Sequence, residues 1–424
     1  MRYAQNSHVA IFRLPAELLS EVFLYVVRSS LRDNANFVTG TFNFLQVCRC
    51  WNEVAVGSPQ LWTQWVAGAV KAWPLFKSRS KDAPLSLTWR LQLPDSARDV
   101  LMDPIPRNIR ELDFVGTHEQ LENFFGTFDS SPPSSASSIR IYTVYYDQSR
   151  DHFTARFLSS PFPNLSQLEF VGLMAASSSP IFTTSNLTSL KLHGAYDDQN
   201  RHNQSQFSQI LQLHPNLQEL VLKEGGLPLV EKSRAPTPVV LPQLVNLTLE
   251  GVVPLIAGFV DLINMSSPLN NVVIHFQYIY SSPTIPSLSS TTRKLLTAYY
   301  GCRGLGYSRK VNYLCVSSEW PINGQAITAA SFPTPGGHPT YNLKLHFHGG
   351  WNKLAEEIVP FFPSKNLHIF AAIGLTLSVE GWRRMLQGMK NLMHLRLSDL
   401  DIGPTLDALS ELDLDDGGVY RGAT

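Results

Sequence analysis

Two histidines in the second half of the chain are the residues whose types and spacing come closest to a metal site. In the segment NLKLHFHGG, His346 and His348 alternate with apolar residues, so a strand would place both on one side together with Lys344. Two imidazoles at this spacing could touch one metal ion. No carboxylate or cysteine accompanies them at ligand spacing, so we expect solvent-facing strand residues and no metal.

Other candidates for chemistry are weaker still. The cysteines Cys48, Cys50, Cys302 and Cys315 lack paired zinc-ligand spacing, and their small number favours a reducing compartment. The basic, tyrosine-containing segment TTRKLLTAYYGCRGLGYSRK has few charges and lacks the glycine order of a phosphate loop. The sequence contains no Gly-x-Ser-x-Gly elbow and no Ser/His/Asp or Cys/His set that can be grouped. We predict no enzyme and no cofactor, with a hydrolase hidden in the later region as an alternative.

Composition excludes several classes of protein. The 424 residues carry 34 Lys+Arg against 34 Asp+Glu, which disfavours a nucleic-acid binder. An apolar content of 44% is ample for large cores. The sequence has neither a cleavable leader pattern nor a run of about 18 apolar residues, so we expect no membrane contact and a cytoplasmic or nuclear location.

The elements at the start of the chain carry more apolar surface than a small domain can bury. The segment RLPAELLSEVFLYVV, residues 13–27, predicts a helix with Pro15 in its first turn and apolar residues on more than one side. FNFLQVCRCWNEVA, residues 42–55, and GSPQLWTQWVAGAV, residues 57–70, predict a second and a third helix. Contiguous apolar surface that a domain of this size leaves exposed indicates a protein partner, and the alternative is that it packs on the rest of the same chain.

The order of LPAELLSEVF, VCRCWNEVA and LW resembles an F-box, the module that docks substrate receptors onto the Skp-family adaptor of cullin-RING ubiquitin ligases. The resemblance implies a three-helix domain over residues 1–70. Positions that match the adaptor-contacting part of the motif are Leu14, Pro15, Leu18, Leu19, Val22, Phe23, Val47, Cys48, Trp51, Leu61 and Trp62.

Short strand signals recur through the rest of the chain. Six segments carry apolar residues in the order L-x-x-L-x-L: NIRELDF, PNLSQLEF, SNLTSLKL, PNLQELVL, PQLVNLTL and KNLMHLRL. Less regular copies lie at PLNNVVI, YNLKLHF and KNLHIF, and helical stretches at FSQILQL, LIAGFVDLINM and GWRRMLQGM separate them. Steps of about 22–30 residues between successive copies are close to the leucine-rich-repeat period. We predict an α/β fold, an irregular leucine-rich-repeat-like solenoid with a curved parallel sheet over residues 71–424.

The repeat is interrupted in three places. The gap between Asp113 and Glu169 interrupts the register, and the Ser/Pro-rich segment of residues 129–138 within it is expected to form a flexible loop. A Ser/Pro/Gly-rich region from Ser281 to Pro339 also breaks the register. The last segment, SELDLDDGGVYRGAT, is expected to begin another strand.

The whole chain resembles the F-box proteins with leucine-rich-repeat-like domains that are abundant in mushroom-forming fungi. This resemblance implies a substrate-recognition subunit of a Skp/cullin/F-box ubiquitin ligase. Its partners would be the Skp-family adaptor, through it a cullin, and a target protein on the solenoid. An F-box protein that uses the adaptor outside a ligase is the alternative.

The solvent-facing residues of the strands raise the hypothesis of a target-binding surface; the alternative is that they are ordinary solvated strand residues with no shared role. Leucines of the L-x-x-L-x-L pattern face the core, so the residues between them point outward. The charged positions predicted there are Glu111, Asp113, Glu169, Lys191, Lys344, His346, His348, His394 and Arg396. Their order along the chain predicts a surface that is acidic at one end and basic at the other.

Overall fold

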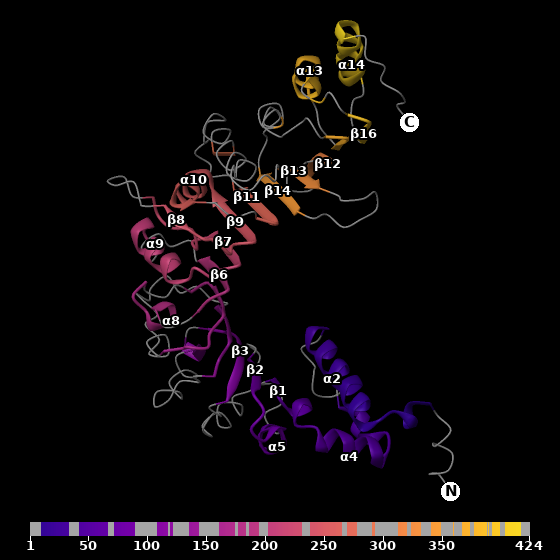
Figure 1. Cartoon of the computed structure of the whole chain (residues 1–424), viewed down its shortest axis with the longest axis vertical. Helices are drawn as coiled ribbons and strands as arrows, with labels where there is room; N and C mark the ends of the chain where they lie inside the picture. The colour runs from indigo at the N-terminus through magenta and orange to yellow at the C-terminus, as the bar shows by residue number, and fades with distance from the viewer. Residues whose placement is uncertain are drawn as a thin grey trace. The chain divides into compact units, whose positions relative to one another are not determined.

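The structure is a computed structural model that describes 10–33, 42–66, 72–89, 108–117, 119–121, 135–143, 161–173, 177–183, 186–194, 202–230, 238–264, 269–277, 291–292, 313–319, 324–331, 341–348, 359, 367–373, 377–387, 389, 392–398 and 403–416. The chain divides into two compact units, Met1–Leu187 and Thr188–Thr424. The boundary predicted between residues 70 and 71 falls inside the first unit. Both units are α/β, with helices and largely parallel strands, as expected (Figure 1).

The first unit begins with helical elements. They are η1 (Ala10–Arg13), α2 (Ala16–Asp33), η2 (Asn43–Gln46), α4 (Arg49–Gly57), η3 (Pro59–Trp62) and α5 (Trp73–Ser80). The first predicted helix is confirmed from Ala16 onward, one residue after Pro15, and it continues to Asp33. The second is divided, because Cys48 has an extended backbone and acts as the N-cap of α4.

The prediction of a third helix over residues 57–70 is wrong in the part that the structure describes. Only the 3₁₀ turn η3 forms, and it is followed by strand β1 (Gln64–Val66), which pairs in parallel with β2 (Leu85–Trp89). The ring of Trp65 is buried 4.7 Å from that of Trp73. This aromatic contact and the strand pairing override the helical periodicity of the segment.

The sheet of the first unit continues through β3 (Ile109–Gly116), β4 (Ser138–Thr143) and β5 (Gln167–Val171), each parallel to its neighbour, and the short α8 (Pro180–Thr183) follows. Leu112, Ile139 and Leu168 stand in register and are buried. Strand β4 lies between Asp113 and Glu169, where we expected the register to be interrupted, and it continues the parallel pairing instead. The sequence of β4 alternates isoleucine with polar residues and lacks the leucine spacing of the repeats. The strand nevertheless pairs in parallel with its neighbours, as the repeat strands do.

The second unit repeats this arrangement. Strands β6 (Ser189–Gly194), β7 (Glu219–Glu224), β9 (Asn246–Val252) and β11 (Asn271–Gln277) are parallel and adjacent. Helices α9 (Gln204–Leu213) and α10 (Val253–Leu262) confirm two predicted helices, and the short strands β8 (Val239–Val240) and β10 (Ile263–Asn264) pair with each other. The side-chain amide of Gln204 donates to the Gly258 carbonyl over 2.8 Å and joins the two helices.

The sheet of the second unit is not parallel throughout. Its strand order after β11 is β14 (Tyr341–His348), β13 (Gly324–Ser331), β12 (Tyr313–Glu319), β15 (Ile369–Ile373) and β16 (His394–Ser398). The pairs β14–β13 and β13–β12 are antiparallel, whereas β11–β14, β12–β15 and β15–β16 are parallel. The region Ser281–Pro339, where we expected the register to be interrupted, therefore contains two strands, β12 and β13, that are antiparallel to each other.

Two helices lie near the end of the second unit. Helix α13 (Val379–Gln387) is as predicted. Helix α14 (Gly403–Asp416) covers the start of the segment where we expected a strand. Pro404 near its first residue fits a helix start. Leu406 and Leu409 are three residues apart, a spacing that fits a helix better than the alternation of a strand.

His202 makes the stability of the second unit depend on pH. Its ring is buried beside Phe207, with ring centroids 6.3 Å apart, and burial lowers its pKa from 6.5 to about 4. Above pH 6.5 the ring is neutral in both folded and unfolded chains. As the pH falls from 6.5 to 4, the unfolded chain takes up a proton that the folded chain does not, so stability decreases.

We expect this single group to lower the free energy of unfolding by about 3 kcal/mol between pH 7 and pH 4. Denaturant unfolding of the wild type and of His202→Gln at a series of pH values measures the effect. The free energy of unfolding of the variant should fall about 3 kcal/mol less than that of the wild type between pH 7 and pH 4. An identical decline in both proteins would show that His202 does not carry it.

Candidate functional site

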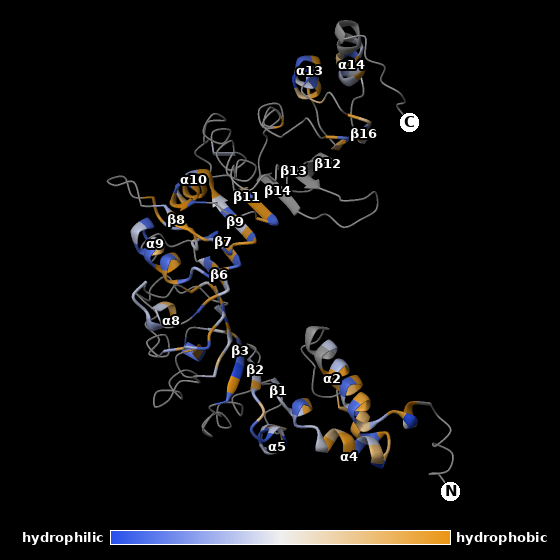
Figure 2. Ribbon diagram, in the orientation of Figure 1, coloured by the Kyte–Doolittle hydropathy of each residue, from blue (hydrophilic) through white to orange (hydrophobic). Residues whose placement is uncertain are grey.

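Helix α2 has apolar residues on two sides, and only one of the two is buried. Leu19, Phe23 and Val27 face the core, with Leu19 only 3% exposed. On the other side, apolar residues recur every three or four positions and are exposed, with Leu18 at 53% and Tyr25 at 75%. In Figure 2 the described part of this helix carries orange, apolar segments beside blue and white ones. We call the exposed set the α2 stripe; its members are Leu14, Leu18, Val22, Tyr25 and Val26.

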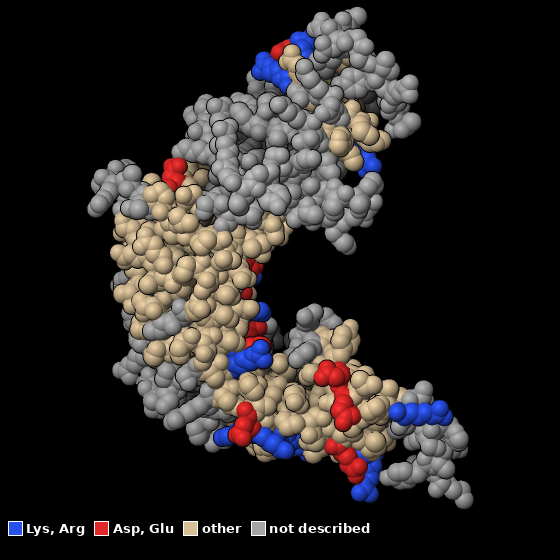
Figure 3. Space-filling model, in the orientation of Figure 1, with Lys and Arg blue, Asp and Glu red and all other residues tan. Residues whose placement is uncertain are grey.

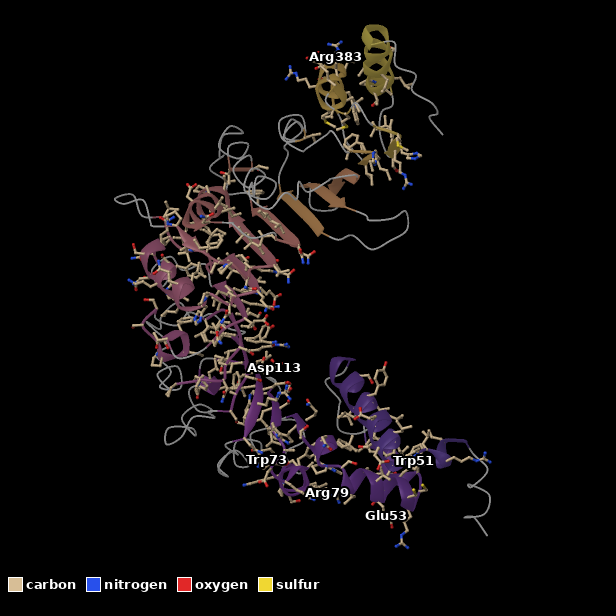
Figure 4. All side chains as sticks on the ribbon, viewed as in Figure 1. Trp51, Glu53, Trp73, Arg79, Asp113 and Arg383 are labelled. Carbon is tan, nitrogen blue, oxygen red and sulfur yellow. The ribbon has the colours of Figure 1, made fainter. Side chains whose placement is uncertain are left out.

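Aromatic contacts hold the buried side of α2. The ring of Phe23 stacks on that of Phe44 at 4.3 Å and meets Trp51 edge-on at 5.2 Å. In Figure 4, Trp51 lies on the side of α4 that faces α2, and Glu53 lies on the opposite side. Ring clusters of this kind fix the position of a helix. The orientation of the α2 stripe toward solvent follows.

Four predicted contact residues belong to the core instead. Leu19, Phe23, Leu61 and Trp62 are buried. The indole nitrogen of Trp62 donates to the Ala55 carbonyl over 2.9 Å, and the guanidinium of Arg79 lies 4.4 Å from its ring centroid. In this structure these four side chains support the exposed surface and do not form it.

The remaining predicted contact residues are at least partly accessible. Leu14, Pro15, Leu18 and Val22 are exposed, and so is Val47 at 53%. Cys48 and Trp51 are half-buried. The Cys48 sulfur accepts a hydrogen bond from the Trp51 backbone N–H over 3.4 Å, which caps α4.

The predicted contact residues do not include Tyr25 and Val26, which continue the α2 stripe beyond the motif. The signal was present, because Val26 follows Leu18 and Val22 at a constant spacing of one helical turn.

The sheet of the first unit brings together the acidic residues predicted for target binding. Asp113, Arg140 and Glu169 stand side by side in register on β3, β4 and β5. The Arg140 guanidinium lies 3.8 Å from Glu169, and the Tyr142 hydroxyl donates to Glu169 over 2.6 Å. Two residues before Asp113, the exposed Glu111 accepts a hydrogen bond from Ser86 over 2.9 Å. Burial and the neighbouring Glu169 raise the pKa of Tyr142, so its hydroxyl stays a donor.

In the second unit, cations and carboxylates of neighbouring strands pair. Lys191 lies 2.8 Å from Glu219, and Lys223 lies 3.4 Å from Glu250. The cation of the first unit, Arg140, is absent from the predicted target-binding residues because its strand β4 was not predicted. We expected a surface with an acidic end and a basic end. The described side chains show instead that opposite charges alternate within each sheet.

The later predicted residues lie on strands of the second unit. On β14, Lys344 stands beside Val273 of β11 and His346 stands beside His275, while His348 is opposite Gly324 of β13; the side chains of these three residues lie outside the described part. His394 and Arg396 are exposed on β16. Strand pairing does place Lys344 and Arg396 in one row, through Thr328, Cys315 and Ala371.

Comparison with known proteins adds no family. No family model matches the chain, and no curated protein has a matching sequence. Within the described ranges, His, Cys, Asp and Glu side chains form no group of three that could hold a metal ion. Among the helices whose residues are described, none has the length and apolar character needed to cross a bilayer.

Proposed function

We propose that this protein is the substrate-recognition subunit of a Skp/cullin/F-box ubiquitin ligase. Residues 1–70 would form the F-box, and residues 71–424 an irregular leucine-rich-repeat-like solenoid that holds a target protein. The observation that carries the proposal is the α2 stripe, an exposed apolar row on a helix whose opposite side is packed in the core.

The size and shape of the stripe support a protein partner. Four of its members stand one helical turn apart, from Leu14 just before α2 to Val26 within it, and all are exposed. A partner helix or groove can bury such a row in one contact. Exposure of contiguous apolar residues costs solubility, so the partner is expected to be bound for most of the protein's lifetime.

The paired strands support the second part of the proposal. Each strand pairs with its neighbours and presents alternate residues on one face, such as Asp113, Arg140 and Glu169 in the first unit. Such a face can hold a target, and ubiquitin transfer would follow from proximity, because the receptor raises the effective concentration of target lysines near the conjugating enzyme. The receptor itself would supply no catalytic group. We place it in the cytoplasm or nucleus.

Affinity purification of the full-length chain tests the function. We expect a purified Skp-family adaptor to form a stoichiometric complex with the chain, and a cullin to join when it is added. Formation of the adaptor complex without cullin would favour an F-box protein that acts outside a ligase. Failure of the adaptor to bind the folded chain would overturn the proposal.

A further inference from the structure

Two carboxylates run along one edge of the α2 stripe. Glu17 and Glu21 are exposed and one helical turn apart. At 100° per residue they lie on the side of the helix that faces away from Leu19 and Phe23, beside Leu18. Figure 3 shows acidic side chains gathered over α2. The outward surface of the helix is thus apolar along one edge and acidic along the other.

Neither carboxylate has a cation inside the described part of the molecule. Within those residues Glu17 and Glu21 form no salt bridge, even though the exposed Arg13 lies four residues before Glu17. Other helical glutamates do have partners: Glu53 lies 2.7 Å from Arg49, and Glu380 contacts Arg384 at 3.1 Å. The acidic edge of α2 is therefore available to a cation from another molecule.

The helix gains little from this pair. Like charges at i and i+4 slightly destabilise a helix. Glu17 lies in the first turn, where the helix dipole offsets this cost, but Glu21 lies beyond it. Helix stability therefore explains a glutamate at position 17, and it does not explain one at position 21.

We propose that the protein groove that covers the α2 stripe has an apolar floor and Lys or Arg side chains along the edge that meets Glu17 and Glu21. This inference rests on the proposed function and specifies the chemistry of the adaptor surface. The apolar floor would supply most of the affinity. The charged edge would speed association and fix the direction in which α2 enters the groove.

Association kinetics of the full-length chain with a purified Skp-family adaptor test the proposal over a range of salt concentrations. For Glu17→Gln combined with Glu21→Gln, we expect the association rate at low salt to fall on the order of tenfold, with a weaker dependence on salt. Glu17→Lys with Glu21→Lys should reverse the dependence, so that added salt speeds binding. The matched control is Glu119→Gln, an exposed carboxylate of the same unit on a different segment.

The outcomes separate this inference from the function itself. If the wild type binds the adaptor and both double variants bind at the same rate with the same salt slope, the charged edge is overturned and the function stands. If the wild type does not bind the adaptor, both are overturned. Self-association of the chain that is lost in Leu18→Gln would assign the stripe to a second copy and also overturn the proposal.

Discussion

Under the proposed function, replacing Leu18 with glutamine, together with Val22→Gln, is expected to weaken binding of the Skp-family adaptor by at least about thirtyfold, which corresponds to a loss of about 2 kcal/mol. Both side chains are exposed members of the α2 stripe, so the folded chain loses little internal packing. Glutamine is a good helix former, and the helix itself should persist. Titration of the adaptor with each variant measures the loss.

The neighbouring residue provides the matched control. Leu19 is 3% exposed, against 53% for Leu18. Leu19→Gln should lower the stability of the helical region by roughly 2–5 kcal/mol, because it places a polar amide in the core and removes apolar contacts. Hydrogen exchange of the α2 and α4 amides should be faster in Leu19→Gln than in the wild type, and unchanged in Leu18→Gln. Equal unfolding in Leu18→Gln and Leu19→Gln would contradict the assignment of the two sides of α2.

Replacing Gly226 with alanine will destabilise the second unit strongly, by at least about 3 kcal/mol. A Cβ at Gly226 would lie 2.1 Å from the backbone oxygen of Leu192, and one at Gly194 would lie 2.2 Å from the backbone carbon of Gly225. The turn after β7 therefore sits directly on the end of β6. Two backbones must separate to admit a methyl group.

Two other glycines complete a graded series for this prediction. A Cβ at Gly251 would meet only the end of the Leu227 side chain, and one at Gly57 would meet nothing within 4 Å. Denaturant unfolding should rank the losses in the order Gly226, Gly251, Gly57, with Gly57→Ala neutral or slightly stabilising. A Gly226→Ala protein as stable as Gly57→Ala would show that the close approach of the two backbones is not needed.

Much of the sheet could be predicted because leucine spacing reports burial directly. Leu168, Leu190, Leu220 and Leu247 are all buried at the expected place in their strands. Strand β4 was missed because its core residues are two isoleucines in a short alternation, a pattern without repeat character. The antiparallel pairs were missed because direction depends on which strands meet, and no local pattern encodes that.

The candidate site could be predicted only in part for a related reason. Periodicity identified α2 as apolar on more than one side, but it could not say which side packs internally. The contacts of Phe23 with Phe44 and Trp51 decide that question, and they join three separate elements. Cross-strand ion pairs such as Lys191 with Glu219 depend in the same way on the register between two strands that are far apart in sequence, which the sequence pattern does not report.

The reversed strands of the second unit have a consequence for synthesis on the ribosome. Strands β7, β9 and β11 can each pair with a strand that has already emerged. Strand β12 emerges next, but its partners are β13 and β15, and neither pairs with β11. Growth of the sheet from β11 therefore pauses until β14 (Tyr341–His348) emerges. Strand β14 then pairs with β11 on one side and with β13 of the antiparallel β12–β13 pair on the other. During that interval no other described strand pairs with the edge of β11 that later holds β14, so we expect nascent chains halted there to depend most on chaperones.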